Sequence, residues 1–302
     1  MMFKLDRRHP STGNYVYVHY LTPRDRCLVL EEIHRACGGC VGCRLSHSVQ
    51  WSIRCMHESS LHDSNSFITL TFAPEHLPED RGLHHFYYQD FMKRLRDRLN
   101  YIPLRYYMCG EYGSKLSRPH FHACIFGYDF PDRILWRNHR GNNLYVSPLL
   151  SDLWPFGFST IGEMNFMTAA YVARYCLKKI TGAPAAQHYE WVDPTNGVIY
   201  SRRPDYSQPS LKPGLARGWF DKFKSDVYPH DRVVLNGKLY QPPKYYDRCF
   251  EADYPLDMEE IKFLRLDKSK VYQEHQSRER LRVREQVKLS QISILKRPYD
   301  DS

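Results

Sequence analysis

The stretch that most constrains the fold is residues 118–126, where polar and apolar side chains alternate. Its composition predicts a β-strand over residues 120–126, entered through Pro119. Alternate side chains of a strand share one face of a sheet, so His120 and His122 point the same way. Both imidazoles offer a ring nitrogen, and together they are close enough to bind one metal ion. Taken alone, the pair equally fits two packed or surface histidines.

A second strand is predicted just before the first, over residues 104–112. The polar connection over residues 113–119 is short, which predicts an antiparallel hairpin. Glu111 ends the earlier strand, across from the histidines, and can complete a set of two histidines and one carboxylate. Such a set leaves positions open for water or a phosphate oxygen. The alternative role for Glu111 is a salt bridge to a nearby Arg or Lys.

A helix with Thr168 as its N-cap is predicted to follow. Tyr171 and Tyr175 are four residues apart and therefore share one face of it. Lys179 lies four residues further on, and Lys178 stands next to that stripe. An aromatic pair at this spacing is usually core packing. Here the lysines are poor neighbours for a buried stripe, and other residues of the helix supply a separate apolar face. The pattern therefore favours reactive phenols.

A tyrosine beside a metal ion has the chemistry needed to cut and rejoin a DNA strand. A phenol has a pKa near 10 and is a weak nucleophile at neutral pH. A divalent cation and a lysine ammonium would make attack on a phosphate feasible by neutralising the developing charge. Attack gives a covalent tyrosyl–DNA ester and a free hydroxyl end. A second tyrosine one turn away could cleave a second strand while the first holds its DNA end.

The overall charge favours a polyanionic partner. The 302 residues include 43 Lys and Arg against 34 Asp and Glu, a formal net charge of +9. Phosphate neutralisation with counterion release is the usual use of such a balance, although a merely basic soluble protein shows it too. No run of about 18 apolar residues appears, so no membrane-spanning segment is expected. No G-x-x-x-x-G-K-[ST] run occurs either, so no nucleotide-driven helicase is expected within the chain.

Three of the nine cysteines, Cys37, Cys40 and Cys43, are clustered at metal-ligand spacing. This spacing predicts a structural Zn²⁺ site that stabilises a small N-terminal lobe, with free thiols as the alternative. A fourth ligand would come from one of four residues: Cys27, His34, His47 or Cys55. The scattered remaining cysteines suit a reducing compartment.

The remaining pattern predicts an α+β protein. Four further elements are expected: helices over residues 44–58 and 89–100, and strands over residues 67–72 and 159–162. Residues 128–160 otherwise look loop-rich, with aromatic anchors at Trp136, Trp154 and Phe158. A long charged helix is expected over residues 258–297. It would be either an arm facing DNA or a partner, or a solvated helix that packs one stripe on the body.

His120-Phe121-His122 and the run from Tyr171 to Tyr175 resemble the two signature motifs of HUH endonucleases with paired tyrosines. The resemblance is strongest to the rolling-circle replication initiators of microviruses, the gokushovirus branch in particular. Further similar stretches lie at residues 37–44, 57–58, 67–71, 109–113, 153–157 and 217–219. The motifs occur in the expected order, and the resemblance runs from about residue 30 to the C-terminus.

The resemblance implies nicking of single-stranded origin DNA, a 5′-phosphotyrosine intermediate and a free 3′-hydroxyl. It implies Mg²⁺ or Mn²⁺ held by His120 and His122, but it does not fix Glu111 as the third ligand. It also implies a compact antiparallel sheet with flanking helices, with the histidines on a central strand and the tyrosines on a helix facing them. Action in the cytoplasm of a bacterial host, with a host helicase and DNA polymerase as partners, follows from the same resemblance.

Four regions are expected: a Cys-rich region with the predicted zinc site over residues 1–62, an HUH nickase core over 63–183, an irregular extension over 184–250 and a basic helical arm over 251–302. Two other functions fit the same residues. A plasmid relaxase or single-strand transposase would use the same chemistry. A zinc-stabilised protein that binds single-stranded DNA without catalysis would form no covalent adduct.

Overall fold

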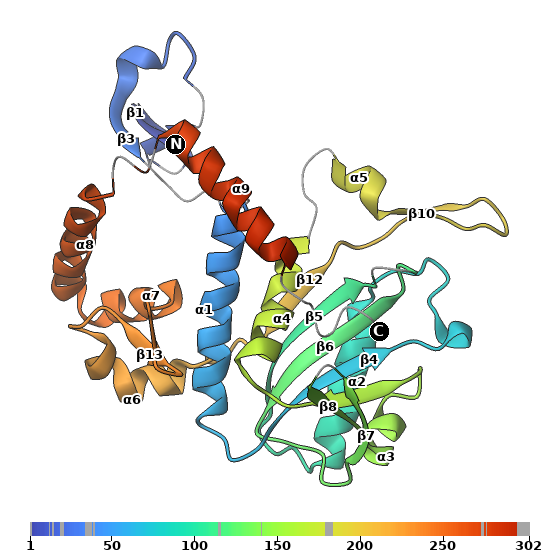
Figure 1. Cartoon of the computed structure of the whole chain (residues 1–302). Coiled ribbons are helices and arrows are strands. Elements are labelled where there is room, and N and C mark those ends of the chain that lie inside the picture. The colour runs from blue at the N-terminus through green and yellow to red at the C-terminus, as the bar shows by residue number, and fades with distance from the viewer. Residues whose placement is uncertain are drawn as a thin grey trace. The chain divides into compact units, whose positions relative to one another are not determined.

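A computed structural model describes residues 2–11, 13, 15–18, 21–33, 38, 40–113, 116–139, 141–178, 184–272, 275 and 277–294. The side chains of residues 2–4, 31–33, 174–178, 184, 278 and 294 lie outside this description. The chain divides into two compact units, Met1–Arg44 and Leu45–Ser302 (Figure 1). None of the helices in the described part is both long and apolar enough to cross a membrane.

The first unit is built on a three-stranded antiparallel sheet in the order β2-β1-β3. Its strands are β1 (Met2–Arg8), β2 (Tyr15–Val18) and β3 (Val29–Ile33). A turn of 3-10 helix, Arg26–Leu28, precedes β3. Leu5 on the middle strand is fully buried. Helix α1 (Val41–Ser59) begins at the end of this unit.

The second unit contains a seven-stranded antiparallel sheet in the order β12-β5-β6-β4-β9-β8-β7. The predicted hairpin is confirmed, and its histidine strand is an interior strand of the sheet. In sheet order the strands are β12 (Tyr206–Pro209), β5 (Arg105–Tyr112), β6 (Pro119–Phe126), β4 (Asn65–Thr71), β9 (Ser159–Gly162), β8 (Asn142–Val146) and β7 (Ile134–His139).

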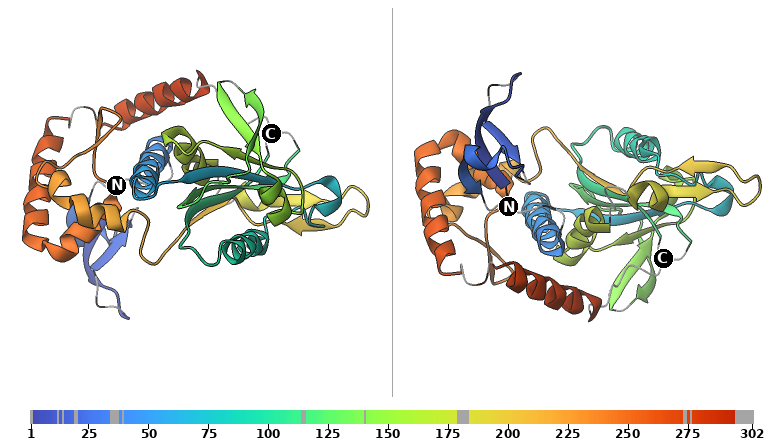
Figure 2. Two further views of the ribbon diagram at one scale, coloured as in Figure 1. Left: turned by 90° about the horizontal axis from the view of Figure 1, so that it is seen from below. Right: turned by 90° about the horizontal axis from the view of Figure 1, so that it is seen from above.

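Helices cover both faces of this sheet, as Figure 2 shows. Phe121 and Ile125 of β6 join the core under α2 (His85–Arg98) and α3 (Pro148–Leu153). The alternate residue Cys124 joins the core under α1 and α4 (Phe166–Lys178). Burial on both faces explains why every residue of β6 is buried. The prediction of a mixed α+β fold, an antiparallel sheet with flanking helices, is confirmed.

The region after the sheet is more helical than the sequence predicted. It contains α5 (Pro184–Tyr189), α6 (Arg217–Val227), α7 (Lys244–Asp253) and α8 (Pro255–Lys270), with short hairpins formed by β10 (Glu190–Val192) and β11 (Ile199–Ser201), and by β13 (Val233–Leu235) and β14 (Lys238–Tyr240). The expected short strands are present. The helices were missed because their apolar faces pack on α1 and on one another around Phe220 and Tyr246, which local periodicity does not reveal.

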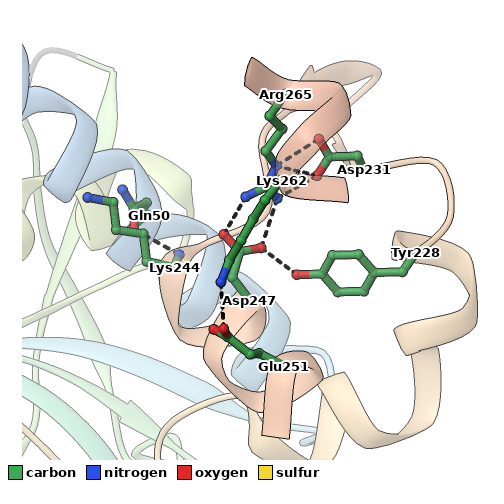
Figure 3. Close-up of polar contacts among 8 residues, drawn as sticks. All are labelled: Gln50, Tyr228, Asp231, Lys244, Asp247, Glu251, Lys262 and Arg265. Carbon is green, nitrogen blue, oxygen red and sulfur yellow. Dashed lines mark hydrogen bonds and ion pairs between the residues drawn. The ribbon is translucent and has the colours of Figure 1, made fainter. Parts of the chain in front are cut away.

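Ion pairs hold part of this helical region together (Figure 3). Arg265 of α8 binds both Asp247 of α7, at 2.8 Å, and Asp231, at 2.9 Å. The Tyr228 hydroxyl donates to Asp247 at 2.6 Å. One guanidinium therefore joins two helices and the loop before β13, a geometry suited to its forked donors.

Three expectations about local structure were wrong. The predicted single helix over residues 258–297 is two, α8 and α9 (Arg278–Ile294). The tyrosine helix begins at Phe166, because the Asn165 side chain accepts hydrogen bonds from the N–H groups of residues 167 and 168 and so acts as the cap in place of Thr168. Of the three expected aromatic anchors only Trp154 is buried, whereas Trp136 and Phe158 are 44% and 49% exposed.

Candidate metal centre and its tyrosine

Strand pairing brings Glu111 and the two histidines together. Glu111 of β5 lies directly opposite His120 of β6, and His122 projects from the same face two residues on. Glu111 Oε1 lies 2.7 Å from His120 Nε2 and 2.9 Å from His122 Nε2. One ligand atom from each residue lies within 4.8 Å of the others, and all three side chains are at most 5% exposed. The predicted trio is therefore one buried cluster.

The outer nitrogen of each imidazole is also held. His120 Nδ1 donates to the Arg118 carbonyl at 3.1 Å, because a carbonyl oxygen can only accept. His122 Nδ1 lies 2.9 Å from the hydroxyl of Thr69, the residue paired with it on β4. Oxygen partners of this kind fix ring orientation in metal sites and leave Nε2 for the ion.

This arrangement fits a bound cation on chemical grounds. Because its Nδ1 carries the proton, a neutral His120 turns an unprotonated Nε2 toward the Glu111 oxygen 2.7 Å away. A nitrogen lone pair and a carboxylate oxygen at that distance require a positive charge between them or on the ring. A protonated histidine supplies one solution, and a metal ion bound to all three residues supplies the other.

Glu111 stays ionised in this setting. Burial raises the pKa of its carboxyl group, but the charges and hydrogen bonds of His120 and His122 outweigh that effect and bring the pKa to about 2. The carboxylate is therefore an anionic ligand at any pH near neutrality, as a site for a hard divalent cation requires.

Tyr171 completes the centre from α4. Its hydroxyl lies 3.4 Å from Glu111 Oε1, and its ring meets His122 edge-on at 5.0 Å between centroids. The side chain is 3% exposed and also contacts Phe67 of β4. Helix α4 packs on β5 and β6, which sets the phenol over the carboxylate. One of the two predicted tyrosines thus lies at the predicted metal site.

The other predicted catalytic residues are described less fully. Tyr175 and Lys178 belong to the backbone of α4, and Tyr175 follows Tyr171 by one helical turn. Their side chains lie outside the description, and Lys179 lies outside the described residues. Their catalytic roles stay predictions.

The cysteine cluster also stays a prediction. Cys40 and Cys43 lie half-buried around the start of α1, whereas Cys37 lies outside the described residues, as does His34, one of the proposed fourth ligands. Cys55, another of those, is fully buried in the core beside Cys124. That environment is typical of a packed thiol.

Sequence reasoning missed Thr69 and the Arg118 carbonyl. Thr69 lies in a strand that was predicted, and alternation places it on one face with Phe67. Its position beside His122 depends on the register between β4 and β6, which are separated by about fifty residues in the chain. A local pattern does not specify that register.

Comparisons with known proteins agree on one family. Residues 65–180, which include Glu111, both histidines and both tyrosines, match the family model for the replication-associated protein ORF2. The chain is 33% identical to replication-associated protein VP4 of Bdellovibrio phage phiMH2K over 278 residues, 89% of this chain and 82% of that protein. It is 31% identical to replication-associated protein ORF2 of Spiroplasma virus 4 over 245 residues, 72% of this chain and 68% of that protein.

A third relative, replication-associated protein ORF4 of Chlamydia phage 1, is 28% identical over 219 residues, which is 70% of this chain and 52% of that protein. No solved structure matches. The likeness to the first relative extends over most of both chains. The chain therefore belongs to the family of replication-associated proteins of microvirus-type phages.

Proposed function

We propose that this protein initiates rolling-circle replication by nicking single-stranded DNA at a phage origin and later rejoining the ends. One observation carries the proposal. The Tyr171 hydroxyl lies 3.4 Å from the Glu111 oxygen that both histidines also contact. A phenol and a metal-type donor set thus meet in one centre, and the chain's relatives are phage replication-associated proteins.

Glu111, His120 and His122 would hold the Mg²⁺ or Mn²⁺ ion. Bound there, the cation would neutralise charge on the scissile phosphate. The chain's own residues do the rest of the positioning. Thr69 and the Arg118 carbonyl keep the imidazoles aligned, and α4 holds the phenol beside them.

Tyr171 or Tyr175 is the proposed nucleophile. The phenolic oxygen forms a bond to phosphorus, and the bond between phosphorus and the 3′ oxygen breaks. The phenol loses one proton and the released 3′ oxygen gains one, so protons balance. Lys178 and Lys179 would stabilise the charge that develops on the phosphate. The products are a 5′-phosphotyrosine ester and a 3′-hydroxyl that primes synthesis.

Attack by that kind of hydroxyl on the ester reverses the reaction and restores a DNA strand without ATP. With two phenols one helical turn apart, one can cleave while the other retains its DNA end. Strand separation and synthesis are assigned to a host helicase and a host polymerase in the bacterial cytoplasm. The structural zinc site at Cys37, Cys40 and Cys43 would support the N-terminal lobe only.

Denaturing electrophoresis tests the proposal. The full chain is incubated with Mn²⁺ and labelled single-stranded DNA tiled across a phage origin. We expect a protease-sensitive shifted band for the wild type and none for the Tyr171→Phe, Tyr175→Phe double variant. Tyr107→Phe is the matched control, since Tyr107 is a buried tyrosine of the same core whose hydroxyl donates to Ser207. A shifted band from the double variant would overturn the assignment of the nucleophile.

The same experiment separates the alternatives. A DNA-binding protein without catalysis would give no shifted band with any strand. A relaxase or transposase would give one with plasmid or transposon-end sequences and none with phage origin strands.

A further inference from the structure

Two large aromatic side chains stand exposed at one edge of the main sheet. Trp136 of β7 is 44% exposed, and Phe158, just before β9, is 49% exposed. Their rings contact each other, with centroids 4.8 Å apart and planes at 62°. The Arg137 guanidinium lies 4.2 Å from the Trp136 ring centroid. Packing between themselves does not bury these rings, and a cation accompanies them.

This aromatic pair, Trp136 and Phe158, lies on the histidine face of the sheet. Thr71 is paired with His120 across β4 and β6, so the two side chains share a face. Thr71 in turn donates its backbone N–H and its hydroxyl to the Phe158 carbonyl, at 2.9 and 2.7 Å. Because Ser159 projects to the opposite face with its partner Leu70, Phe158 projects to the face of Thr71 and His120.

The distance from the catalytic centre is short. Neighbouring strands lie about 4.8 Å apart, so the backbone of Phe158 is about 10 Å from that of His120, two strands away. Trp136 continues in the same direction by one ring contact. A strand of DNA with its phosphate at His120 reaches this distance within a few nucleotides.

The surface between the two places is open and hydroxylated. Thr69, Thr71 and Thr160, which face the same side, are half-buried. Their neighbours Ile68 and Ile161, which face α2, are fully buried. A single strand could therefore lie over the three threonines.

Trp136 also has an irregular backbone setting. The register between β7 and β8 shifts between Leu135 and Arg137, which makes Trp136 the extra residue of a β-bulge. A bulge re-aims a side chain relative to a regular strand. Here it places the indole against Phe158.

We propose that Trp136 and Phe158 form a stacking site for unpaired bases that flank the scissile phosphate, with Arg137 contributing its charge. The assignment of the phosphate to the histidine centre rests on the proposed function. Single-stranded DNA fits this surface because its bases expose flat π-faces that stack on aromatic rings, and its backbone is attracted by arginine. Continuity with the histidine row favours DNA over a protein partner.

Equilibrium binding of two strands of equal length tests the site. One is a labelled thymidine homopolymer, and the other is the corresponding abasic deoxyribose–phosphate chain, which keeps the charge and lacks bases. Anisotropy is measured in the Tyr171→Phe, Tyr175→Phe background to avoid covalent capture. We expect tighter binding of the homopolymer and about tenfold weaker binding for each ring removed in Trp136→Ala and Phe158→Ala.

The abasic chain should bind all these variants equally, and Trp136→Phe should keep most of the preference. Tyr101→Ala is the matched control, because Tyr101 is 72% exposed in the turn before β5, at the end of that strand remote from Glu111. The preference should be unchanged there. If the Trp136→Ala, Phe158→Ala double variant keeps the wild-type preference, or loses both strands equally, the stacking site is wrong.

Failure of this proposal and failure of the proposed function give different results. A wild-type covalent adduct without any effect of the two rings on base preference removes only the stacking site. A ring-dependent preference without an adduct keeps the stacking site and removes the nickase.

Discussion

Two buried glutamates in the second unit show opposite uses of the same carboxylate. Glu111 is 2% exposed and contacts two imidazoles, whereas Glu58 of α1 is 3% exposed and contacts an arginine and a backbone N–H. Arg105 Nε lies 2.7 Å from Glu58 Oε1, and Ala216 N–H donates to Oε2. The partners of Glu58 are permanent, while histidines can lose their protons and bind a metal instead.

The difference separates a structural joint from a reactive centre. Ala216 has a left-handed backbone, with φ of 61°, at the start of α6, and Glu58 supplies the cap that its side chain lacks. Next to it, Arg54 donates to the Leu215 carbonyl at 3.2 and 3.0 Å. These contacts fasten α1 to α6, so removing Glu58 should affect folding and removing Glu111 should affect chemistry.

The largest expected effect is on the reactive side. His120→Ala or His122→Ala should reduce adduct formation by about 10³-fold, because the metal-type donor set loses a ligand. Binding of single-stranded DNA should remain and stay salt-sensitive. Quantitative adduct assays at limiting Mn²⁺, with binding measured in parallel, check this. Wild-type rates in either variant would show that the cluster is not a metal centre.

Glu58→Gln should lower the free energy of unfolding by about 3 kcal/mol, because it leaves the charge of Arg105 largely buried without its partner. Glu111→Gln should change it by less than about 1 kcal/mol, since an amide can still hydrogen-bond to neutral imidazoles. Urea denaturation of both variants without metal makes the comparison. Equal losses would mean that Glu111 is a structural residue like Glu58.

His57 extends the comparison to pH. It is buried on α1, its ring stacks on Trp219 with centroids 3.5 Å apart, and Nδ1 lies 2.8 Å from the Tyr246 hydroxyl. Burial lowers the pKa of His57 to about 4. The unfolded chain therefore takes up the proton first, and stability falls as the pH drops from about 6.5 toward 4.

Between pH 7 and 5 this one group should cost about 2 kcal/mol of unfolding free energy. Denaturation midpoints across that range measure the slope. His57→Phe keeps a ring against Trp219 and removes the titration, so its slope should be flatter. An unchanged slope would assign the pH dependence to another group.

The smallest effect is expected at Thr69. Thr69→Val removes the hydroxyl beside His122 Nδ1 and keeps the shape of the side chain. We expect about tenfold weaker Mn²⁺ dependence of adduct formation, because the ring loses its orienting partner. Titration of Mn²⁺ against adduct yield measures it. The matched Thr160→Val change, on the same face of β9, should leave the titration unaltered.

The sequence predicted those parts of the site that depend on local geometry. A short connection forces the hairpin that sets Glu111 opposite His120, and helical spacing relates Tyr171 to Tyr175. Parts that depend on distant pairing were missed, among them Thr69 beside His122. The exposure of Trp136 was also missed, because whether an aromatic is buried depends on the packing around it rather than on its own residue type.

The central claim is that a tyrosine of α4 attacks DNA at this centre. Mass spectrometry of the trypsin- and nuclease-treated adduct tests it most directly, by locating the residue that carries the nucleotide mass. The account predicts that mass on Tyr171 or Tyr175, and its disappearance when His120 is replaced by alanine. Nucleotide mass on any other residue, or an adduct that survives loss of both phenols, would contradict it.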